Sequence, residues 1–291
     1  MKNRTRILLC SDLDRTLLPN GPQPESPEAR PLLRCLSDRR ELELVYVTGR
    51  DRGLILEAIR EYDLPLPGSV IGDVGSTLYQ VAGYEGETRL TPSDEWKKAI
   101  AGDWKDMSSW DLAEVFADLE GIRLQEAEKQ NEFKLSYYGE PGLDHKELVA
   151  GMKRRMEELG ISSSLIWSID EEKGLGLLDI LPGSANKQRA VRFLMDQLNY
   201  DESDVVFAGD SGNDLHALTS GLQAVLVANA SEFVRNSAQE ALAAKGISEK
   251  LYLARGDFFG MNGNYSAGVL EGLAHFKPEV RRWIEEALAS G

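Results

Sequence analysis

Two aspartates separated by one residue carry the strongest chemical signal in the sequence. Asp12 and Asp14 lie in the run DLDRT, directly after a short apolar segment at residues 6–11. One carboxylate in such a pair could attack phosphorus and form an acyl phosphate, which divides one difficult hydrolysis into two easier steps. The other could protonate the leaving oxygen and then activate water. A turn or helix cap made from the same residue types is the structural alternative.

A second polar signal follows the next apolar run. Thr48, Gly49 and Arg50 end the segment ELELVYVTGR. The threonine hydroxyl and a backbone freed by glycine could donate hydrogen bonds to phosphoryl oxygens. Taken alone, Thr48 would more simply cap the helix that follows.

Two further signals lie after residue 180. Asp210 and Asp214 frame the run GDSGND, and carboxylate and amide oxygens of this kind suit Mg²⁺. The longer acidic ladder and closing glutamate of a calcium-binding EF-hand loop are missing from this run. Lys187 follows PGSAN, and its ammonium could hold a phosphoryl group; in isolation it would be a surface charge.

The elements expected around these signals bring them together. Residues 6–11 and 41–50 read as buried parallel strands joined by a helical segment, the pattern of a right-handed βαβ unit. Ligands bind at the carboxyl ends of the strands in such sheets, and this is where the signals fall. About four carboxylates at one edge would repel phosphate unless Mg²⁺ and Lys187 compensated their charge.

The pattern changes from about Thr91. Amphipathic segments at 93–100 and 109–120 precede alternating runs at 123–128 and 132–139, a helix at 144–159 and two more strands at 163–169 and 175–181. The βα rhythm then resumes with a helix at 187–198. We therefore predict an α/β fold: a doubly wound, mostly parallel sheet in a Rossmann-like core, with a smaller inserted α+β cap domain. The predicted division is core 1–88, cap 89–182 and core 183–291.

Composition narrows the classes of partner. The chain has 291 residues and a net charge of −15, which argues against nucleic acid because phosphate backbones are bound by clustered Lys and Arg. No run reaches the ~20 apolar residues of a membrane span, and the acidic pair breaks the first apolar stretch too early for a signal peptide. The two cysteines suggest neither disulfides nor metal ligation. We expect a cytoplasmic monomer that contacts neither nucleic acid nor membrane.

Taken in order, DLDRT, VTGR, Lys187 and GDSGND resemble the four motifs of the haloacid dehalogenase superfamily. The resemblance implies Asp12 as nucleophile and Asp14 as general acid and base. It implies Thr48 and Lys187 as catalytic phosphoryl ligands. It also implies Mg²⁺ bound by Asp12, the main-chain carbonyl of Asp14, Asp210 and Asp214.

Further segments resemble the sucrose-phosphatase-like subgroup. They are VGSTLY at 74–79, EFKLSYY at 132–138, DILPGSANKQRA at 179–190 and GVLEGLAHF at 268–276, and the insert lies where that subgroup has its cap. The likeness implies an Mg²⁺-dependent phosphatase that hydrolyses sucrose 6-phosphate through an aspartyl phosphate. The substrate contacts that it implies are Thr48, Gly49, Arg50, Gly75, Ser76, Lys134, Asn186 and Lys187.

Several alternatives stay open at this point. The substrate could be another sugar phosphate such as mannosylfructose phosphate, or the chain could be a non-catalytic partner of a sugar-phosphate synthase. A phosphosugar mutase would share the fold. A receiver-like signalling module is opposed by the order of the acidic residues and by the insert. Trp96, Trp104 and Trp110, at the start of the insert, are expected to pack the hinge rather than a sugar.

Overall fold

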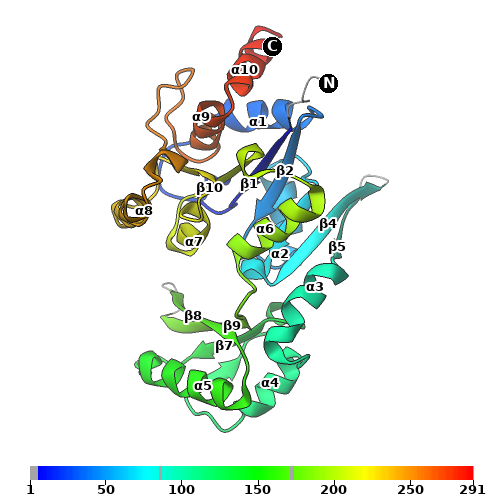
Figure 1. The fold of residues 1–291 in the computed structure, drawn as a ribbon, viewed down its shortest axis with the longest axis vertical. Helices are drawn as coiled ribbons and strands as arrows, with labels where there is room; N and C mark the ends of the chain where they lie inside the picture. The colour runs from blue at the N-terminus through cyan, green and yellow to red at the C-terminus, as the bar shows by residue number, and fades with distance from the viewer. Residues whose placement is uncertain (1–5, 85–86, 171–173, 291) are drawn as a thin grey trace.

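An eight-stranded sheet forms the core. The computed structural model describes residues 6–84, 87–170 and 174–290, and Figure 1 shows its elements. The strand order is β12-β11-β10-β1-β2-β3-β4-β5. Neighbours from β12 to β3 run parallel, whereas β4 and β5 are antiparallel. The strands are β1 (Ile7–Ser11), β2 (Leu42–Val47), β3 (Ser69–Gly72), β4 (Thr77–Tyr84), β5 (Glu87–Pro92), β10 (Val205–Gly209), β11 (Gln223–Leu226) and β12 (Leu251–Leu253).

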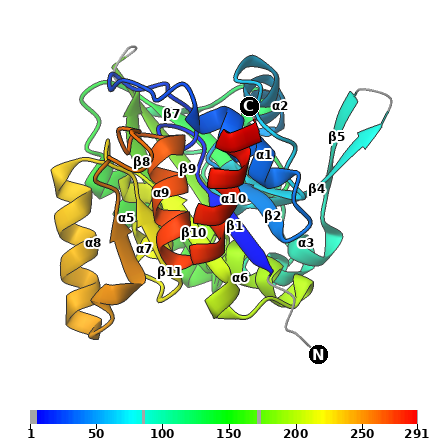
Figure 2. The ribbon, with the colours of Figure 1, turned by 90° about the horizontal axis from the view of Figure 1, so that it is seen from above.

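Helices cover both faces of this sheet, as its continuous apolar strands require. Successive side chains of β1 point to opposite faces: Leu8 and Cys10 pack in one hydrophobic cluster, Ile7 and Leu9 in another. The first face carries α6 (Lys187–Leu198), α7 (Leu215–Leu218) and α8 (Glu232–Lys245). The second carries α1 (Ala29–Ser37), α2 (Arg52–Glu61), α9 (Ser266–Phe276) and α10 (Pro278–Ser290), as Figure 2 shows from above. The doubly wound fold predicted from the sequence is confirmed.

The cap is a second, four-stranded antiparallel sheet backed by helices. Its strand order is β6-β7-β9-β8, with β6 (Ile122–Leu124), β7 (Leu135–Gly139), β9 (Leu175–Pro182) and β8 (Ser163–Asp170). Its helices are α3 (Asp94–Ala101), α4 (Ser109–Val115) and α5 (His145–Leu159). Figure 1 shows α4 and α5 on the side of this sheet away from the core. The opposite face of the cap sheet therefore looks toward the core.

Short 3₁₀ turns connect many of these elements. They are η1 (Asp73–Gly75), η2 (Gly102–Trp104), η3 (Ala127–Lys129), η4 (Glu202–Asp204), η5 (Gly212–Asp214) and η6 (Ser248–Lys250). The turn η3 falls where the sequence predicted a strand at 123–128. The Gln130 side chain explains this difference, because it bonds the backbone of Gln125 and Ser136 in place of strand pairing.

The hinge between core and cap is packed by aromatic residues. Trp96 and Trp104 are fully buried, and the Trp96 ring lies 5.0 Å from that of Phe193 on α6, whereas Trp110 is exposed. The predicted boundary between residues 88 and 89 lies inside β5, which pairs with β4 along its whole length. The division into domains stays a prediction, and a first boundary after Pro92 would keep this strand intact.

None of the described helices combines the length and the apolar character that crossing a membrane requires. A cytoplasmic location and a monomeric state stay predictions.

Candidate active site

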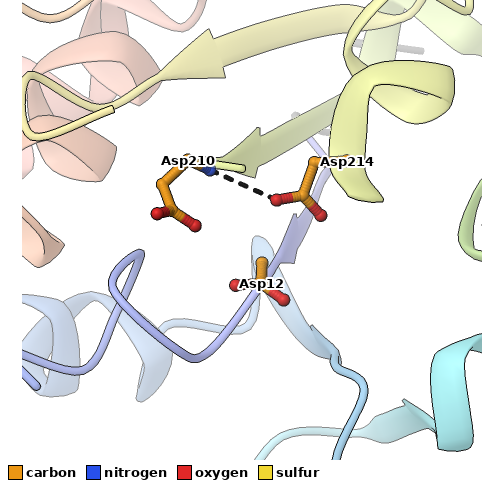
Figure 3. A group of neighbouring side chains, drawn as sticks. All are labelled: Asp12, Asp210 and Asp214. Carbon is orange, nitrogen blue, oxygen red and sulfur yellow. Dashed lines mark hydrogen bonds between the residues drawn. The ribbon is translucent and has the colours of Figure 1, made fainter. Parts of the chain in front are cut away.

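Three buried carboxylates meet at the carboxyl edge of the core sheet. Asp12 follows β1 and Asp210 follows the adjacent strand β10, while Asp214 ends the turn η5. Figure 3 shows the three side chains facing one another, and carboxylate oxygens from all three lie within 4.8 Å of each other. Their exposed fractions are 4%, 5% and 0%. Sequence reasoning predicted this grouping because parallel strands place their carboxyl ends at one edge.

Backbone contacts hold Asp214 in place. Its Oδ2 accepts hydrogen bonds from the backbone N–H of Asp210 (3.3 Å, dashed in Figure 3) and of Ser211 (3.2 Å). A Cβ on Gly209 would lie 2.8 Å from the Asp214 carboxyl carbon, so this approach requires glycine at residue 209.

Lys187 lies among these carboxylates. Its Nζ is 2.6 Å from Asp12 Oδ1 and 2.8 Å from Asp214 Oδ1, and the residue is 3% exposed. Lys187 is the first residue of α6, and Asn186 fixes that helix start by accepting a hydrogen bond from Arg189 N at 2.9 Å. The ammonium also donates to Asn213 Oδ1 at 3.1 Å. Asn213 was missed as a contact, although the GDSGND motif contains it.

The charges in this cluster are crowded. Burial raises the pKa of Asp12 to about 8, against the opposing effect of the Lys187 ammonium. Burial and the charge of Asp214 raise the pKa of Asp210 to about 6. Burial disfavours the charged form of Lys187, yet Asp12 and Asp214 outweigh it and raise the Lys187 pKa. A divalent cation among these oxygens would relieve the repulsion, so the residues fit a metal such as Mg²⁺.

Arg15 and Thr16 border Asp210 on the solvent side. Thr16 Oγ1 donates to Asp210 Oδ1 at 3.3 Å, and Arg15 Nε lies 3.6 Å from Asp210 Oδ2. Arg15 has a left-handed backbone (φ 59), held by Asn20 Oδ1 on its N–H and by Asn229 on its carbonyl. The sequence assigned Arg15 no role, and the structure places its guanidinium beside the carboxylate cluster.

Asp14 does not belong to the group of three carboxylates and pairs instead with Arg50. Arg50 Nη2 is 2.6 Å from Asp14 Oδ1 and Arg50 Nε is 2.9 Å from Oδ2, while Asn20 Nδ2 donates to Oδ1 at 2.7 Å. Burial alone would raise the pKa of Asp14, but the hydrogen bonds and charge of Arg50 outweigh it and lower the pKa. Asn20 was not predicted, since it lies in a proline-rich loop without a motif.

The loop after β2 is tied to the turn η1. Thr48 is fully buried, its Oγ1 accepts from Arg50 N at 3.1 Å, and the neighbouring Gly49 is exposed. Val74 N donates to Thr48 O at 3.2 Å, and Asp73 N donates to Arg50 O at 2.9 Å. These two backbone hydrogen bonds therefore hold the two loops together.

Three predicted sugar contacts have structural partners. Gly75 (φ 106) is packed so tightly that a Cβ would lie 2.4 Å from the carbonyl carbon of Asn186. Ser76 is buried and donates to Asp73 O at 3.1 Å, and Asn186 caps α6. Gly75, Ser76 and Asn186 thus hold η1 against the start of α6. Their contact with a sugar stays a prediction.

Lys134 comes from the cap and is 5% exposed. Its Nζ lies 3.8 Å from Asp73 Oδ1 of the core and 4.0 Å from Asp179 Oδ1 of β9. A second lysine of the cap, Lys129, pairs with Asp51 of the core at 2.8 Å. The two lysines thus link the cap to the loops beside the carboxylate cluster.

Comparison with known proteins places the chain among sugar-phosphate phosphatases. The family model described as sucrose-6F-phosphate phosphohydrolase matches residues 5–277. A HAD-like hydrolase from Nitrosococcus oceani is 55% identical over 282 residues, which cover 97% of this chain and 75% of that protein. Mannosylfructose-phosphate phosphatase from Agrobacterium fabrum is 28% identical over 274 residues, covering 92% and 96%.

A solved structure also places the chain among sugar-phosphate phosphatases. Sucrose-phosphatase from Synechocystis sp., in complex with sucrose and phosphate, matches with a TM-score of 0.68 and 26% identity, covering 93% of this chain and 98% of that one. Some relatives are longer: the chain matches 52% of the length of sucrose-phosphatase 1 from Nicotiana tabacum, at 27% identity over 241 residues.

Proposed function

Because the chain belongs to the sucrose-6F-phosphate phosphohydrolase family of the haloacid dehalogenase superfamily, we propose that it hydrolyses sucrose 6-phosphate to sucrose and phosphate. The broader activity follows from the family itself: the chain is a phosphoric monoester hydrolase that acts on sugar phosphates. The observation that carries the proposal is the buried group of Asp12, Asp210 and Asp214 around Lys187, at a sheet edge faced by a cap.

Asp12 is the proposed nucleophile. Its carboxylate oxygen attacks phosphorus, the bond between phosphorus and the sugar oxygen breaks, and an aspartyl phosphate forms on Asp12. Water then attacks this phosphorus and releases phosphate. Thr48, the Gly49 backbone and Lys187 hold the phosphoryl oxygens in both steps, which positions the reacting atoms and offsets charge.

Asp14 is the proposed proton carrier. It protonates the sugar oxygen as that oxygen leaves, and it later takes a proton from the attacking water. The ion pair with Arg50 favours the ionised form of Asp14, which is the form needed for the second step. For the first step the pair must open, and this would free the Arg50 guanidinium to contact the substrate.

Asp12, the main-chain carbonyl of Asp14, Asp210 and Asp214 are the proposed Mg²⁺ ligands. The bound ion would neutralise charge on the phosphoryl group and on the crowded carboxylates. Support comes from the three carboxylates within 4.8 Å of one another, with the pKa of Asp12 and of Asp210 raised despite the nearby Lys187 and Arg15 cations.

A panel of phosphorylated sugars tests the proposal. Purified protein with Mg²⁺ is incubated with sucrose 6-phosphate, mannosylfructose phosphate, glucose 6-phosphate and trehalose 6-phosphate, beside Asp12→Asn as control. We expect free phosphate chiefly from sucrose 6-phosphate and none from the control.

Mannosylfructose phosphate is the second candidate substrate, because the phosphatase from Agrobacterium fabrum matches nearly along its whole length. Preference for it would keep the mechanism and change the substrate. Absence of Asp12-dependent release from all four compounds would instead favour a different substrate or a non-catalytic partner of a sugar-phosphate synthase.

A further inference from the structure

A buried polar cluster lies where the cap meets the core, beside the loop of Thr48. It consists of Lys134, just before β7, Asp179 on β9 and Asp73 in the turn η1; we call these residues the junction triad. Lys134 is 5% and Asp73 3% exposed, and the Asp179 side chain is 25% exposed. Charged groups this deeply buried need partners, so their hydrogen bonds can be counted one by one.

The Lys134 ammonium has ion-pair distances but no direct hydrogen bond. It is 3.8 Å from Asp73 Oδ1 and 4.0 Å from Asp179 Oδ1, both too long for an N–H···O bond. No other acceptor for this ammonium occurs among residues 6–84, 87–170 and 174–290. Its three N–H donors therefore remain available, on a side chain that is 7% exposed.

Each carboxylate of the junction triad is only half engaged. Asp73 Oδ2 accepts from Thr77 Oγ1 at 2.9 Å and from Tyr79 OH at 3.3 Å. Asp179 Oδ1 accepts from Ser136 Oγ at 2.5 Å. Within the described part of the chain, Asp73 Oδ1 and Asp179 Oδ2 have no hydrogen-bond donor. The junction triad thus offers donors and acceptors side by side.

This pattern matches hydroxyl groups. A hydroxyl accepts from an ammonium and donates to a carboxylate at the same time, whereas a phosphate would accept from Lys134 but be repelled by two carboxylates. Two carboxylates flanking one ammonium can hold two hydroxyls. The complementary ligand is a neutral polyol, and Asp179 is the member of the triad that ligand could reach from solvent.

The turn that carries Asp73 is strained and adjoins the phosphate-binding loop. Asp73 (φ 51) and Val74 (φ 62) both have left-handed backbones, which is uncommon and costly for a β-branched residue such as valine. Asp73 N and Val74 N donate to the carbonyls of Arg50 and Thr48. The backbone is thus bent where it places one carboxylate next to Lys134 while remaining tied to the phosphate site.

We propose that Asp73, with Lys134 and Asp179, binds hydroxyl groups of the sugar that carries the phosphate and determines which sugar phosphate is hydrolysed. This inference rests on the proposed function and adds two acidic residues to the substrate contacts expected from the sequence. Asp73 and Asp179 act on the sugar, whereas Asp12, Asp210 and Asp214 act on the phosphoryl group.

The test compares two phosphate esters in Asp73→Asn. This variant keeps the shape and the acceptor for Thr77 but removes the charge. We expect kcat/KM for the preferred sugar phosphate to fall about 10- to 100-fold, the usual effect of losing a hydrogen bond to a charged group. Hydrolysis of p-nitrophenyl phosphate, which has no sugar hydroxyl, and inhibition by inorganic phosphate should stay unchanged.

Lys129→Gln is the matched control, since it removes a cap-to-core ion pair outside the junction triad. It should leave the ratio of the two kcat/KM values as in the wild type. If Asp73→Asn fails to fold, the more exposed Asp179→Asn gives the same comparison.

Two results would overturn the inference. One is an equal fall in kcat/KM for both esters, which indicates a structural role, and the other is wild-type kcat/KM for both esters in both aspartate variants. A wild-type enzyme that hydrolyses p-nitrophenyl phosphate but no sugar phosphate would contradict the proposed function instead, and the inference with it.

Discussion

The cluster of Asp12, Lys187, Asp210 and Asp214, which we call the catalytic edge, and the junction triad are both buried groups of charged residues. They differ in the distances between the lysine and its carboxylates. At the catalytic edge, Lys187 lies 2.6 and 2.8 Å from its two carboxylates. In the junction triad, Lys134 lies 3.8 and 4.0 Å from its two carboxylates. The first cluster is in direct contact and has excess negative charge, whereas in the second no direct hydrogen bond joins Lys134 to either carboxylate.

We propose that the two clusters have different tasks: the catalytic edge acts on the phosphoryl group, and the junction triad acts on the sugar. In the proposed mechanism, contact between Lys187 and Asp12 orients the nucleophile and compensates charge for any phosphate ester. The looser junction triad, divided between cap and core, would complete its hydrogen bonds with the hydroxyl groups of a bound sugar. We therefore infer that residues of the core carry out the reaction and that residues where core and cap meet select the sugar.

Metal removal should give the largest effect and affect only the catalytic edge. Chelation with EDTA is expected to abolish phosphate release, because Asp12, Asp210 and Asp214 then repel the phosphoryl group. Saturating Mg²⁺, at a hundred times its Kd, should add about 2.7 kcal/mol of stability. The increase in melting temperature on addition of Mg²⁺ measures this stabilisation. The Asp210→Asn variant should not show this shift in melting temperature. A shift retained in that variant would contradict the proposed ligand set.

Lys187→Met should give the next largest effect. Its buried ammonium contacts two buried carboxylates, and removal of one partner from such a group typically costs about 3 to 5 kcal/mol. We also expect kcat to fall at least about 100-fold, as for the loss of a donor to transition-state charge. Denaturant unfolding and phosphate release check the two effects. Wild-type activity in this variant would remove Lys187 from the phosphate site.

Gly75→Ala tests the packing that joins the two clusters. The new Cβ would lie 2.4 Å from the carbonyl carbon of Asn186 at a φ of 106, so we expect a loss of at least about 2 kcal/mol of stability. Gly102→Ala is the matched control, because its Cβ meets nothing within 4 Å and its backbone is helical (φ −60). The control should change stability by under about 1 kcal/mol. Equal melting temperatures for both variants would show that η1 is not fixed by this contact.

Lys129→Gln should have the smallest effect. The pair with Asp51 joins cap and core, but the Lys129 side chain is 36% exposed. Exposed ion pairs contribute about 0 to 1 kcal/mol, so the melting temperature should hardly change. A large loss of stability would mean that this contact, rather than the hinge packing of Trp96 and Trp104, holds the cap.

The sequence predicted the catalytic edge better than the junction triad, for a physical reason. Asp12, Thr48 and Asp210 each follow an apolar strand, and neighbouring parallel strands bring such residues together whatever the loops do. The helix predicted at 187–198 matches α6 (Lys187–Leu198). The pairing of Asp14 with Arg50, rather than with the carboxylate cluster, depends on side-chain direction, which spacing does not encode.

The junction triad could not be predicted in the same way. Pairing of β7 with β9 brings Asp179 near Lys134 within the cap, whereas Asp73 meets Lys134 because the cap docks beside β3, and no local pattern specifies that docking. Similarly, β5 joined the core although residues 89–92 were assigned to the cap, since an antiparallel pairing with β4 was not visible in its short alternating pattern. The helices α9 and α10 were not among the predicted elements: residues 266–273 of α9 are all buried, so this segment lacks the one-sided apolar pattern that predicts a helix.

Detection of a phosphoryl group on Asp12 is the most direct test of the account. Asp14→Asn should still form the aspartyl phosphate from p-nitrophenyl phosphate, whose leaving group needs no proton, but should hydrolyse it slowly. After acid quenching, mass spectrometry of the peptide that contains Asp12 is predicted to show the mass of one added phosphoryl group, and Asp12→Asn should show none. A phosphoryl group on another residue, or turnover by Asp12→Asn, would contradict the assignment of the catalytic edge.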